Sequence, residues 1–348
     1  MKKILVINRE SLVARGVFSL SVDTRITDAL DYLKDRGLIE FCVFSEHDPL
    51  VYKALDWCDV IFFSKHSSKL ALDIMLEARK RNIRSIYDID DWIFSFPDYS
   101  GGKSQSSKLE NIKKLVAAAN NVTVANKVLM DNINGKFCDN ACLVPNGMYV
   151  EKYIDDVDFD NYKESEPPKI VFTNADFLKI RKSKNTILNV FQEFFYKHKD
   201  FRLIFYGDPF PEMTSLSFMH YTNRIPYYTY MRALFKGNYV CAITPLGGEE
   251  DSDCSFFNSC KNPFKYLNYG AAGVPGIYSN AEIYKDCVID GKTGLKTDNT
   301  KEGWNRALDL MISDFSLRQK IRKNAFNDIM QNYHIRFSAE KFYALFSA

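Results

Sequence analysis

Short apolar runs alternate with amphipathic segments through the first half of the chain. The runs predict strands at Lys3–Asn8, Ile39–Phe44, Val60–Ser64, Ser85–Ile89, Asn121–Ala125 and Ala141–Pro145. The segments between them predict helices at Asp23–Arg36, Lys69–Arg81, Ser107–Ala119 and Val128–Ile133. This alternation predicts a parallel sheet with helices on both faces, whose ligands lie beyond the C-terminal ends of the strands.

The second half of the chain repeats the pattern. Strands are predicted at Lys169–Thr173, Phe201–Tyr206, Tyr239–Thr244 and Val274–Tyr278. Helices are predicted at Lys184–His198, Tyr227–Leu234, Gly303–Ser313, Ser316–Asn332 and Ile335–Phe346, with a short one from Phe264 that Gly273 ends as a left-handed cap. An acidic, Pro-ended stretch without an apolar period separates the halves. We therefore predict a first domain over 1–150, a linker over 151–168, a second domain over 169–332 and a terminal helix over 333–348.

Composition narrows the class of protein. The 348 residues are 46% hydrophobic and 26% charged, which is typical of a soluble globular protein with two cores. A net charge of +2, with no zinc-finger spacing or long basic run, disfavours a nucleic-acid partner. No apolar run reaches the roughly 18 residues of a membrane span. The N-terminus has too short an apolar run for a signal peptide, so we expect a cytoplasmic protein whose eight cysteines are reduced and hold no metal.

The stretch Lys261–Ser279 has the strongest functional signal. Asn262-Pro263 marks the start of a short helix, and a strand follows it. A helix N-terminus beside the C-terminal ends of parallel strands favours anions, and Lys261 and Lys265 add positive charge there. The pattern predicts an anion-binding site.

This stretch resembles the donor-binding region of family 4 glycosyltransferases. The matching positions are Lys261, Lys265, Tyr266, Tyr269, Ala271, Gly273 and Pro275, followed by the turn Asp290-Gly291-Lys292-Thr293-Gly294. The resemblance implies the GT-B fold: two Rossmann-like α/β domains facing each other across a cleft, with the C-terminal helix crossing back to the first. It also implies retention of anomeric configuration without a metal ion. The chain departs from the family where two Glu usually stand, because Cys260 and Asn268 occupy those positions.

The resemblance assigns roles within this stretch. Lys261, Asn262, Lys265 and Asn268 are expected to bind the donor. The second Glu of the family commonly holds the donor ribose; Asn268 still offers hydrogen bonds but carries no charge.

Three aspartates follow a predicted strand in Tyr87-Asp88-Ile89-Asp90-Asp91. Because burial of unpaired carboxylates is costly, we expect them to lie outside the core, with Asp88 and Asp90 on the same side. Family members often place a His near the reacting sugar at this point, so the resemblance makes Asp90 and Asp91 candidate catalytic residues. The alternative is a solvated turn.

A basic loop follows the strand Lys169–Thr173. The family holds the donor diphosphate with a basic pair here, and Lys179 and Lys184 fit its spacing, with Arg181 as a substitute. Lys184 is also expected to act in catalysis by stabilising the leaving diphosphate. Gly207 matches a family turn near the nucleotide base and allows close backbone approach. The alternative is a solvated basic loop.

The resemblance implies a hexosyltransferase that moves a sugar from a nucleotide diphosphate donor, UDP- or GDP-linked, to a hydroxyl of a glycan or lipid-linked acceptor. No separate cofactor is expected, and cell-surface polysaccharide or glycoconjugate synthesis is the expected setting. Lys80, Arg81 and Arg84 form either a solvated helix face or a contact with the inner face of a membrane. The alternatives are a nucleotide-sugar epimerase and a non-catalytic sugar-nucleotide-binding protein.

Overall fold

The chain forms two compact units, which are described separately. The computed structural model describes the chain apart from residues 10–18, 97–105, 154–162, 175–176 and 348 and the side chains of 106–107 and 177–179, so much of the predicted linker lies outside it. The first unit comprises Met1–Tyr149, Cys260–Asn262 and His334–Ala348. The second comprises Val150–Ser259 and Pro263–Tyr333. The last helix therefore belongs with the N-terminal part of the chain.

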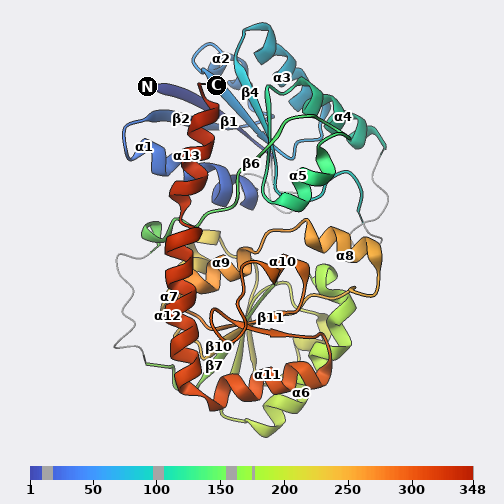
Figure 1. The fold of residues 1–348 in the computed structure, drawn as a ribbon, viewed down its shortest axis with the longest axis vertical. Helices are drawn as coiled ribbons and strands as arrows, with labels where there is room; N and C mark the ends of the chain where they lie inside the picture. The colour runs from blue at the N-terminus through green and yellow to red at the C-terminus, as the bar shows by residue number, and fades with distance from the viewer. Residues whose placement is uncertain (10–18, 97–105, 154–162, 175–176, 348) are drawn as a thin grey trace. The chain divides into compact units, whose positions relative to one another are not determined.

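The first unit contains a parallel six-stranded sheet in the order β2-β1-β3-β4-β5-β6 (Figure 1). Its strands are β1 (Lys2–Asn8), β2 (Ile39–Ser45), β3 (Val60–Ser64), β4 (Arg84–Ile89), β5 (Asn121–Val124) and β6 (Ala141–Leu143). All six were predicted to within one or two residues of these ends, because buried parallel strands are short continuous apolar runs. The strand order reverses between β1 and β3, and ligands of such sheets bind beyond the strand ends at this point.

Helices follow most strands of this sheet. They are η1 (Val22–Thr27), α1 (Asp28–Lys34), α2 (Val51–Ala54), α3 (Lys69–Lys80), α4 (Ser106–Ala118), α5 (Lys127–Ile133) and α13 (Ile335–Leu345). The predicted helix Asp23–Arg36 begins as the π-helical segment η1 before it continues as α1. α13 packs beside α1, and its Phe342 joins the core of this unit (Figure 1). Ser338 Oγ on α13 donates to the carbonyl of Pro145 at 2.6 Å, which confirms the expected return of the last helix.

The second unit contains another parallel six-stranded sheet, in the order β12-β11-β10-β7-β8-β9. Its strands are β7 (Lys169–Asn174), β8 (Arg202–Gly207), β9 (Met219–Thr222), β10 (Cys241–Thr244), β11 (Gly276–Ser279) and β12 (Leu295–Thr297). The prediction missed β9 and β12, which are short edge strands without an apolar run. Numbered within the unit this order is the Rossmann order, and it reverses between β7 and β10.

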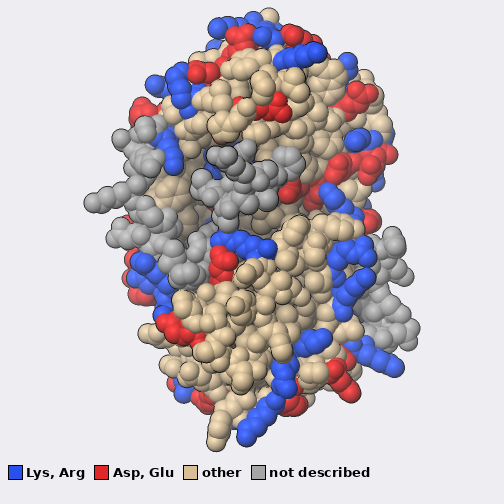
Figure 2. All heavy atoms as spheres, turned by 180° about the vertical axis from the view of Figure 1, so that it is seen from behind, with Lys and Arg blue, Asp and Glu red and all other residues tan. Residues whose placement is uncertain are grey.

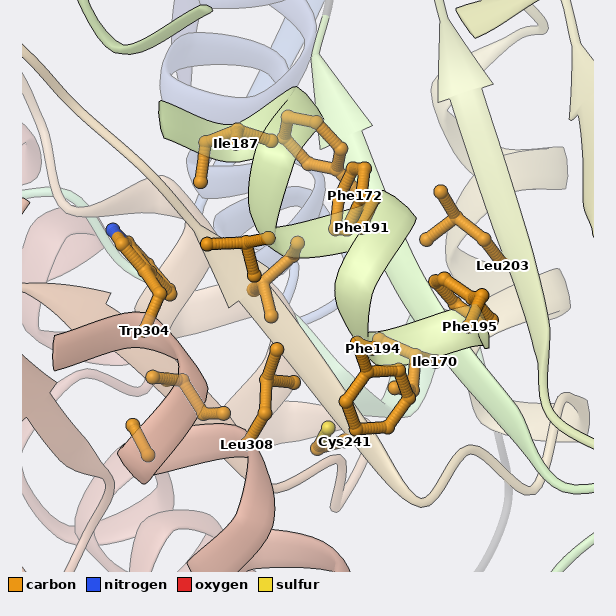
Figure 3. Packing of buried hydrophobic residues seen from close by; sticks show 14 of the residues in the cluster. Ile170, Phe172, Ile187, Phe191, Phe194, Phe195, Leu203, Cys241, Trp304 and Leu308 are labelled. Atoms are coloured by element: carbon orange, nitrogen blue, oxygen red, sulfur yellow. The ribbon is translucent and has the colours of Figure 1, made fainter. Parts of the chain in front are cut away.

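Helices cover this second sheet. They are η3 (Val150–Lys152), η4 (Phe177–Ser183), α6 (Lys184–Lys197), η5 (Pro211–Met213), α7 (Tyr227–Lys236), α8 (Ser252–Ser259), α9 (Phe264–Ala271), α10 (Glu282–Lys285), α11 (Lys301–Ser313) and α12 (Phe315–Asn332). Figure 3 shows Phe172 of β7, Phe191 of α6 and Trp304 of α11 within one buried cluster. The buried residues of α6 recur at helical spacing and form one apolar face: Ile187, Val190, Phe191, Phe194 and Phe195.

Charges of both signs are interspersed on the face seen in Figure 2, in agreement with the small net charge. Among the residues that the structure describes, no helix is long and apolar enough to cross a membrane. Of the eight cysteines, Cys58, Cys241, Cys254, Cys260 and Cys287 are buried free thiols.

Candidate functional site

Two loops meet where the strand order of the second sheet reverses. Asn174 ends β7, and Thr244 ends β10 just before Gly247 and Gly248. A Cβ on Gly247 would lie 2.8 Å from the backbone N of Ser183, so this loop and the start of α6 are in close backbone contact. Gly248 has φ +87°, a conformation that glycine adopts without strain. The arrangement brings backbone groups and a helix N-terminus together at the edge where such sheets bind ligands.

The basic side chains predicted to hold a diphosphate lie beside this contact. Lys184 is the first residue of α6; its side chain is 32% exposed, forms an ion pair with Glu212 and lies 5.9 Å from the centre of the Phe210 ring. Arg181 is exposed. Lys182 was not predicted, and its Nζ lies 4.0 Å from an Asp251 carboxylate oxygen. The side chain of Lys179 lies outside the described residues.

Asn268 lies on α9. It is buried, and its Oδ1 accepts a hydrogen bond of 2.6 Å from the hydroxyl of Tyr227, the first residue of α7. Tyr230 donates to Thr173 Oγ1 at 3.2 Å in the same region. Tyr227 was not predicted as a site residue, because its partner Asn268 lies 41 positions away in the sequence. The only local signal was the Tyr-rich start of the predicted helix.

A buried polar atom at the end of β7 is unsatisfied. Among the described residues, Asn174 Nδ2 has no hydrogen-bond partner. Buried polar groups are nearly always hydrogen-bonded, so an orphaned one indicates a ligand or an ordered water. The Asn174 amide fits a polar ligand bound at the carboxyl edge of the second sheet.

The remaining predicted donor residues are placed as follows. Lys265 lies on α9 with its Nζ 6.0 Å from the centre of the Phe172 ring. Gly273 has φ +62°, which confirms the predicted left-handed cap, and Gly207 has φ +114°, a conformation that favours glycine. Lys261 and Asn262 lie in the turn before α9 and group with the first unit rather than with the helix that follows them.

The carboxyl edge of the first sheet holds a buried ion pair between Arg25 and Asp88. Arg25 Nε donates to Asp88 Oδ2 at 2.8 Å, and Nη2 donates to Oδ1 at 2.9 Å. Arg25 Nη1 also donates to Asn146 Oδ1 at 2.8 Å, and Thr123 Oγ1 donates to Asp88 at 2.6 Å. The two carboxylate oxygens are therefore satisfied without solvent.

Lys65 follows β3 in a left-handed conformation, with φ +49°. Its Nζ lies 2.5 Å from Asp90 Oδ1 and 2.9 Å from Asp91 Oδ2. Asp90 is buried, whereas the Asp91 side chain is 41% exposed. Burial disfavours the charged form of Asp90, but the attraction of Lys65 outweighs it and holds the pKa of Asp90 below its usual value. The same ion pairs raise the pKa of Lys65 despite its burial.

The expectation that the three aspartates lie outside the core is wrong for Asp88 and Asp90. Both are buried. The cost of burial applies to unpaired carboxylates, and each of these two has its own cation. Asp91 alone presents a half-exposed carboxylate at this edge.

His66, next to Lys65, is completely buried. Its backbone carbonyl accepts a hydrogen bond from the Tyr87 hydroxyl at 2.6 Å. Burial, together with nearby Arg9, lowers the pKa of His66 to about 3, so the imidazole is neutral.

The basic residues at the C-terminal end of α3 are already paired. Arg81 bonds Asp56 at 2.6 Å and Glu77 at 3.0 Å, and Lys80 lies 3.3 Å from Glu77. Arg84 donates to Asn121 at 2.8 Å. The carboxylates offset part of the positive charge of Lys80 and Arg81, whereas Asn121 is neutral and leaves the charge of Arg84 in place.

No family model matches the sequence, and no curated protein sequence matches it. Solved structures do match its fold. Sucrose-phosphate synthase from Thermosynechococcus elongatus aligns with TM-score 0.68 and 13% identity, over 100% of this chain and 98% of the other. HepE from Anabaena, in complex with UDP-glucose, aligns with TM-score 0.66 and 14% identity over both full chains. A putative UDP-N-acetylglucosamine 2-epimerase from Listeria monocytogenes aligns with TM-score 0.58 and 10% identity, over 97% and 94%.

The likeness extends over both units, each with its parallel sheet and covering helices. The chain therefore has the GT-B fold, with two Rossmann-like α/β domains.

Proposed function

We propose that the protein is a glycosyltransferase that takes a sugar from a nucleotide diphosphate donor and passes it to a hydroxyl group. One observation carries the proposal: Lys184 starts a helix beside the Gly247–Gly248 loop, at the reversal point of the second sheet. A helix N-terminus, backbone groups and a cation together suit a diphosphate. The donor therefore binds the second unit.

The donor site is assigned in detail on the same basis. Lys184 holds the diphosphate together with Arg181, and Lys179 completes the basic set. Asn268 accepts a hydrogen bond from Tyr227 and donates one to a ribose hydroxyl, at the position where the family that the sequence resembles usually has a glutamate. Lys265 adds a further donor contact on α9, and Gly207 lets the base approach the backbone.

In the reaction, an acceptor hydroxyl oxygen forms a bond to the anomeric carbon as the bond from that carbon to the diphosphate oxygen breaks. The proton of the hydroxyl passes to the leaving diphosphate, and the anomeric configuration is retained. Lys184 stabilises the charge that develops on the diphosphate, so no metal ion is required.

The first unit binds the acceptor, a glycan or a lipid-linked sugar used in cell-surface polysaccharide or glycoconjugate synthesis. The exposed carboxylate of Asp91 accepts a hydrogen bond from the acceptor, while Asp90, buried beside Lys65, fixes its position. The protein works in the cytoplasm, with peripheral contact at the inner face of the membrane as part of the proposal.

Thermal unfolding with UDP, GDP, dTDP, CMP and NAD in turn tests the donor class. The HepE structure holds UDP-glucose, so UDP is the first to measure. A ligand at about 100 times its dissociation constant stabilises by roughly 2.7 kcal/mol, which raises the unfolding temperature by several degrees. A shift with one nucleoside diphosphate supports the proposal, whereas a shift with NAD alone overturns it.

A variant pair locates the site. Lys184→Ala is expected to weaken nucleoside diphosphate binding about tenfold, because a charge-assisted bond contributes roughly 1.5–3 kcal/mol. Lys197→Ala is the control, since Lys197 lies at the other end of α6 and pairs with Glu193. If both variants bind the nucleoside diphosphate with equal affinity, Lys184 does not lie in the donor site.

Two other functions use the same fold. The Listeria neighbour makes a nucleotide-sugar epimerase the second candidate. Incubation with UDP-glucose or UDP-N-acetylglucosamine, without acceptor, separates the two functions, because an epimerase converts the nucleotide sugar alone. A non-catalytic binding protein would bind the nucleotide and release no sugar to any acceptor.

A further inference from the structure

The lysine assigned to the diphosphate already has an anionic partner. Lys184 Nζ forms an ion pair with Glu212 of η5, the short helix that follows β8. Neither residue is deeply buried, because the Lys184 and Glu212 side chains are 32% and 51% exposed. The hydrogen bond from Lys184 lowers the pKa of Glu212, so the carboxylate is charged at neutral pH.

Two other cations of the second unit near the C-terminal ends of its strands are paired in the same way. Arg224 Nη2 lies 2.5 Å from Asp208 Oδ2, just beyond the end of β8. Lys182 lies 4.0 Å from Asp251 in the loop after β10. A diphosphate that binds Lys184 competes with Glu212 for the lysine, and the carboxylate stays close to the phosphates.

A carboxylate in this position acts unequally on the donor and the product. The diphosphate of a nucleotide sugar carries two negative charges. Once the sugar has left, the terminal phosphate gains a second ionisation, with a pKa of about 6, so the free nucleoside diphosphate carries about three. Repulsion from Glu212 is then greater for the product than for the donor.

We propose that Glu212 is a specificity-determining residue that favours the sugar-bearing donor over the free nucleoside diphosphate. It recovers Lys184 when the product leaves and so promotes product release. The proposal rests on the proposed function, because it takes Lys184 as the diphosphate ligand. It adds to that function a reason why the more highly charged product does not block the site.

The test compares Glu212→Gln with the wild-type full chain by isothermal titration calorimetry, using UDP and UDP-glucose at pH 7.5. Glutamine keeps the shape of the side chain and removes its charge. Because exposed ion pairs are weak, we expect UDP affinity to rise about two- to fivefold more than UDP-glucose affinity. Glu193→Gln is the matched control: Glu193 pairs with Lys197 and Lys301 at the far end of α6, and its loss should leave the ratio unchanged.

Two further measurements separate charge from structure. At pH 5.5 the terminal phosphate of UDP is largely protonated, so the extra gain for UDP in Glu212→Gln should disappear. In the Lys184→Ala background, competition for the lysine is absent but repulsion between Glu212 and the phosphates remains, so Glu212→Gln should still raise UDP affinity more than UDP-glucose affinity. A merely structural role of Glu212 would change affinity equally at both pH values.

The outcomes distinguish this inference from the proposed function. If the wild type binds UDP and UDP-glucose, and Glu212→Gln changes both equally, the role of Glu212 is wrong while the donor site stands. If the wild type binds neither these nor GDP and GDP-mannose, both proposals are overturned. A selective gain for UDP at pH 7.5 that is absent at pH 5.5 supports both.

Discussion

Arg25 and Asp88 form an ion pair that is closed to solvent, with a distance of 2.8 Å between Nε and Oδ2 and neither side chain exposed. Arg25 comes from the π-helical segment η1, and Asp88 comes from β4, 63 positions further along the chain. The Arg25 guanidinium also lies 5.7 Å from the ring of Phe342, so the pair joins the sheet, η1 and the last helix. It is a structural element of the first unit.

Breaking this pair on one side should destabilise the protein severely. Asp88→Asn leaves Arg25 buried without its counter-charge, and loss of one partner of a buried pair costs about 3–5 kcal/mol. The double variant Arg25→Met/Asp88→Leu should regain much of that loss, because the two charges are removed together. Urea unfolding of the full chain measures both. Additive losses in the double variant would contradict the pairing.

The ion pair of Lys65 with Asp90 should stabilise the protein in a pH-dependent way. Lys65→Met leaves the buried Asp90 carboxylate unpaired, which costs about 3 kcal/mol at pH 7. The pKa of Asp90 is lowered in the folded protein, so the pair stabilises above the unfolded value of about 3.9 and that contribution is lost as pH falls further. The loss caused by Lys65→Met should therefore shrink below about pH 4.

Lys69→Met is the matched control for Lys65→Met. Lys69 lies a few residues further along, but its ion pair with Asp73 is exposed on α3, so its loss should change stability by less than about 0.5 kcal/mol. Denaturation at several pH values compares the two. A constant loss for Lys65→Met from pH 7 to pH 3 would contradict the proposed charge state of Asp90.

His66 should make the protein less stable in acid. Its folded pKa of about 3 lies below the unfolded value of about 6.5, so between these values the unfolded chain binds the extra proton. Stability then rises with pH across this window, by up to about 1.4 kcal/mol per pH unit. His66→Phe removes the titrating group and should flatten the slope, whereas the exposed His47→Gln is the control. An unchanged slope in His66→Phe would show that other groups cause it.

Gly247→Ala should displace the Gly247–Gly248 loop and weaken donor binding. The added Cβ would lie 2.8 Å from Ser183 N and 2.9 Å from Lys182 Cβ, so the loop must move away from the start of α6. Displacements of about 1 Å can cost up to 100-fold in well-positioned sites, and we expect UDP affinity to fall at least about threefold.

Gly135→Ala provides the comparison for Gly247→Ala. Gly135 has φ +75° and open space around it, so alanine adds backbone strain of about 1 kcal/mol without touching a neighbour. This variant lies in the first unit and should lower the unfolding temperature without changing UDP affinity. Calorimetric titration with UDP distinguishes the variants, and equal affinity in both would argue against a donor site at the Gly247 loop.

Much of the fold was predictable because a strand buried in a parallel sheet is a continuous apolar run in the sequence. Val60–Ser64 is a continuous apolar run, and it is a central strand. Edge strands such as Met219–Thr222 are partly exposed to solvent and have no such apolar run. The π-helical start of the first helix could not be predicted either, since its residues have ordinary helical spacing.

The sequence predicted which loops carry the candidate site residues but not which side chains those residues contact. Spacing after β7 pointed to Lys184, yet its partner Glu212 lies 28 positions away in another loop. Asn268 was singled out by resemblance, whereas its bond to Tyr227 depends on how α7 and α9 pack. Charge in sequence does not reveal pairing, because ion pairs form between strand ends that only the sheet order brings together.

The sequence by itself determined two series of alternating strands and helices, the glycine turns at Gly207 and Gly273, and the loops with charged residues at strand ends. These follow from local periodicity, backbone conformation and the cost of burying unpaired charge. Tertiary structure decided which charges are buried. Asp88 and Asp90 lie inside because Arg25 and Lys65 reach them from other elements, and a carboxylate is stable in the core only where a folded neighbour supplies its counter-charge.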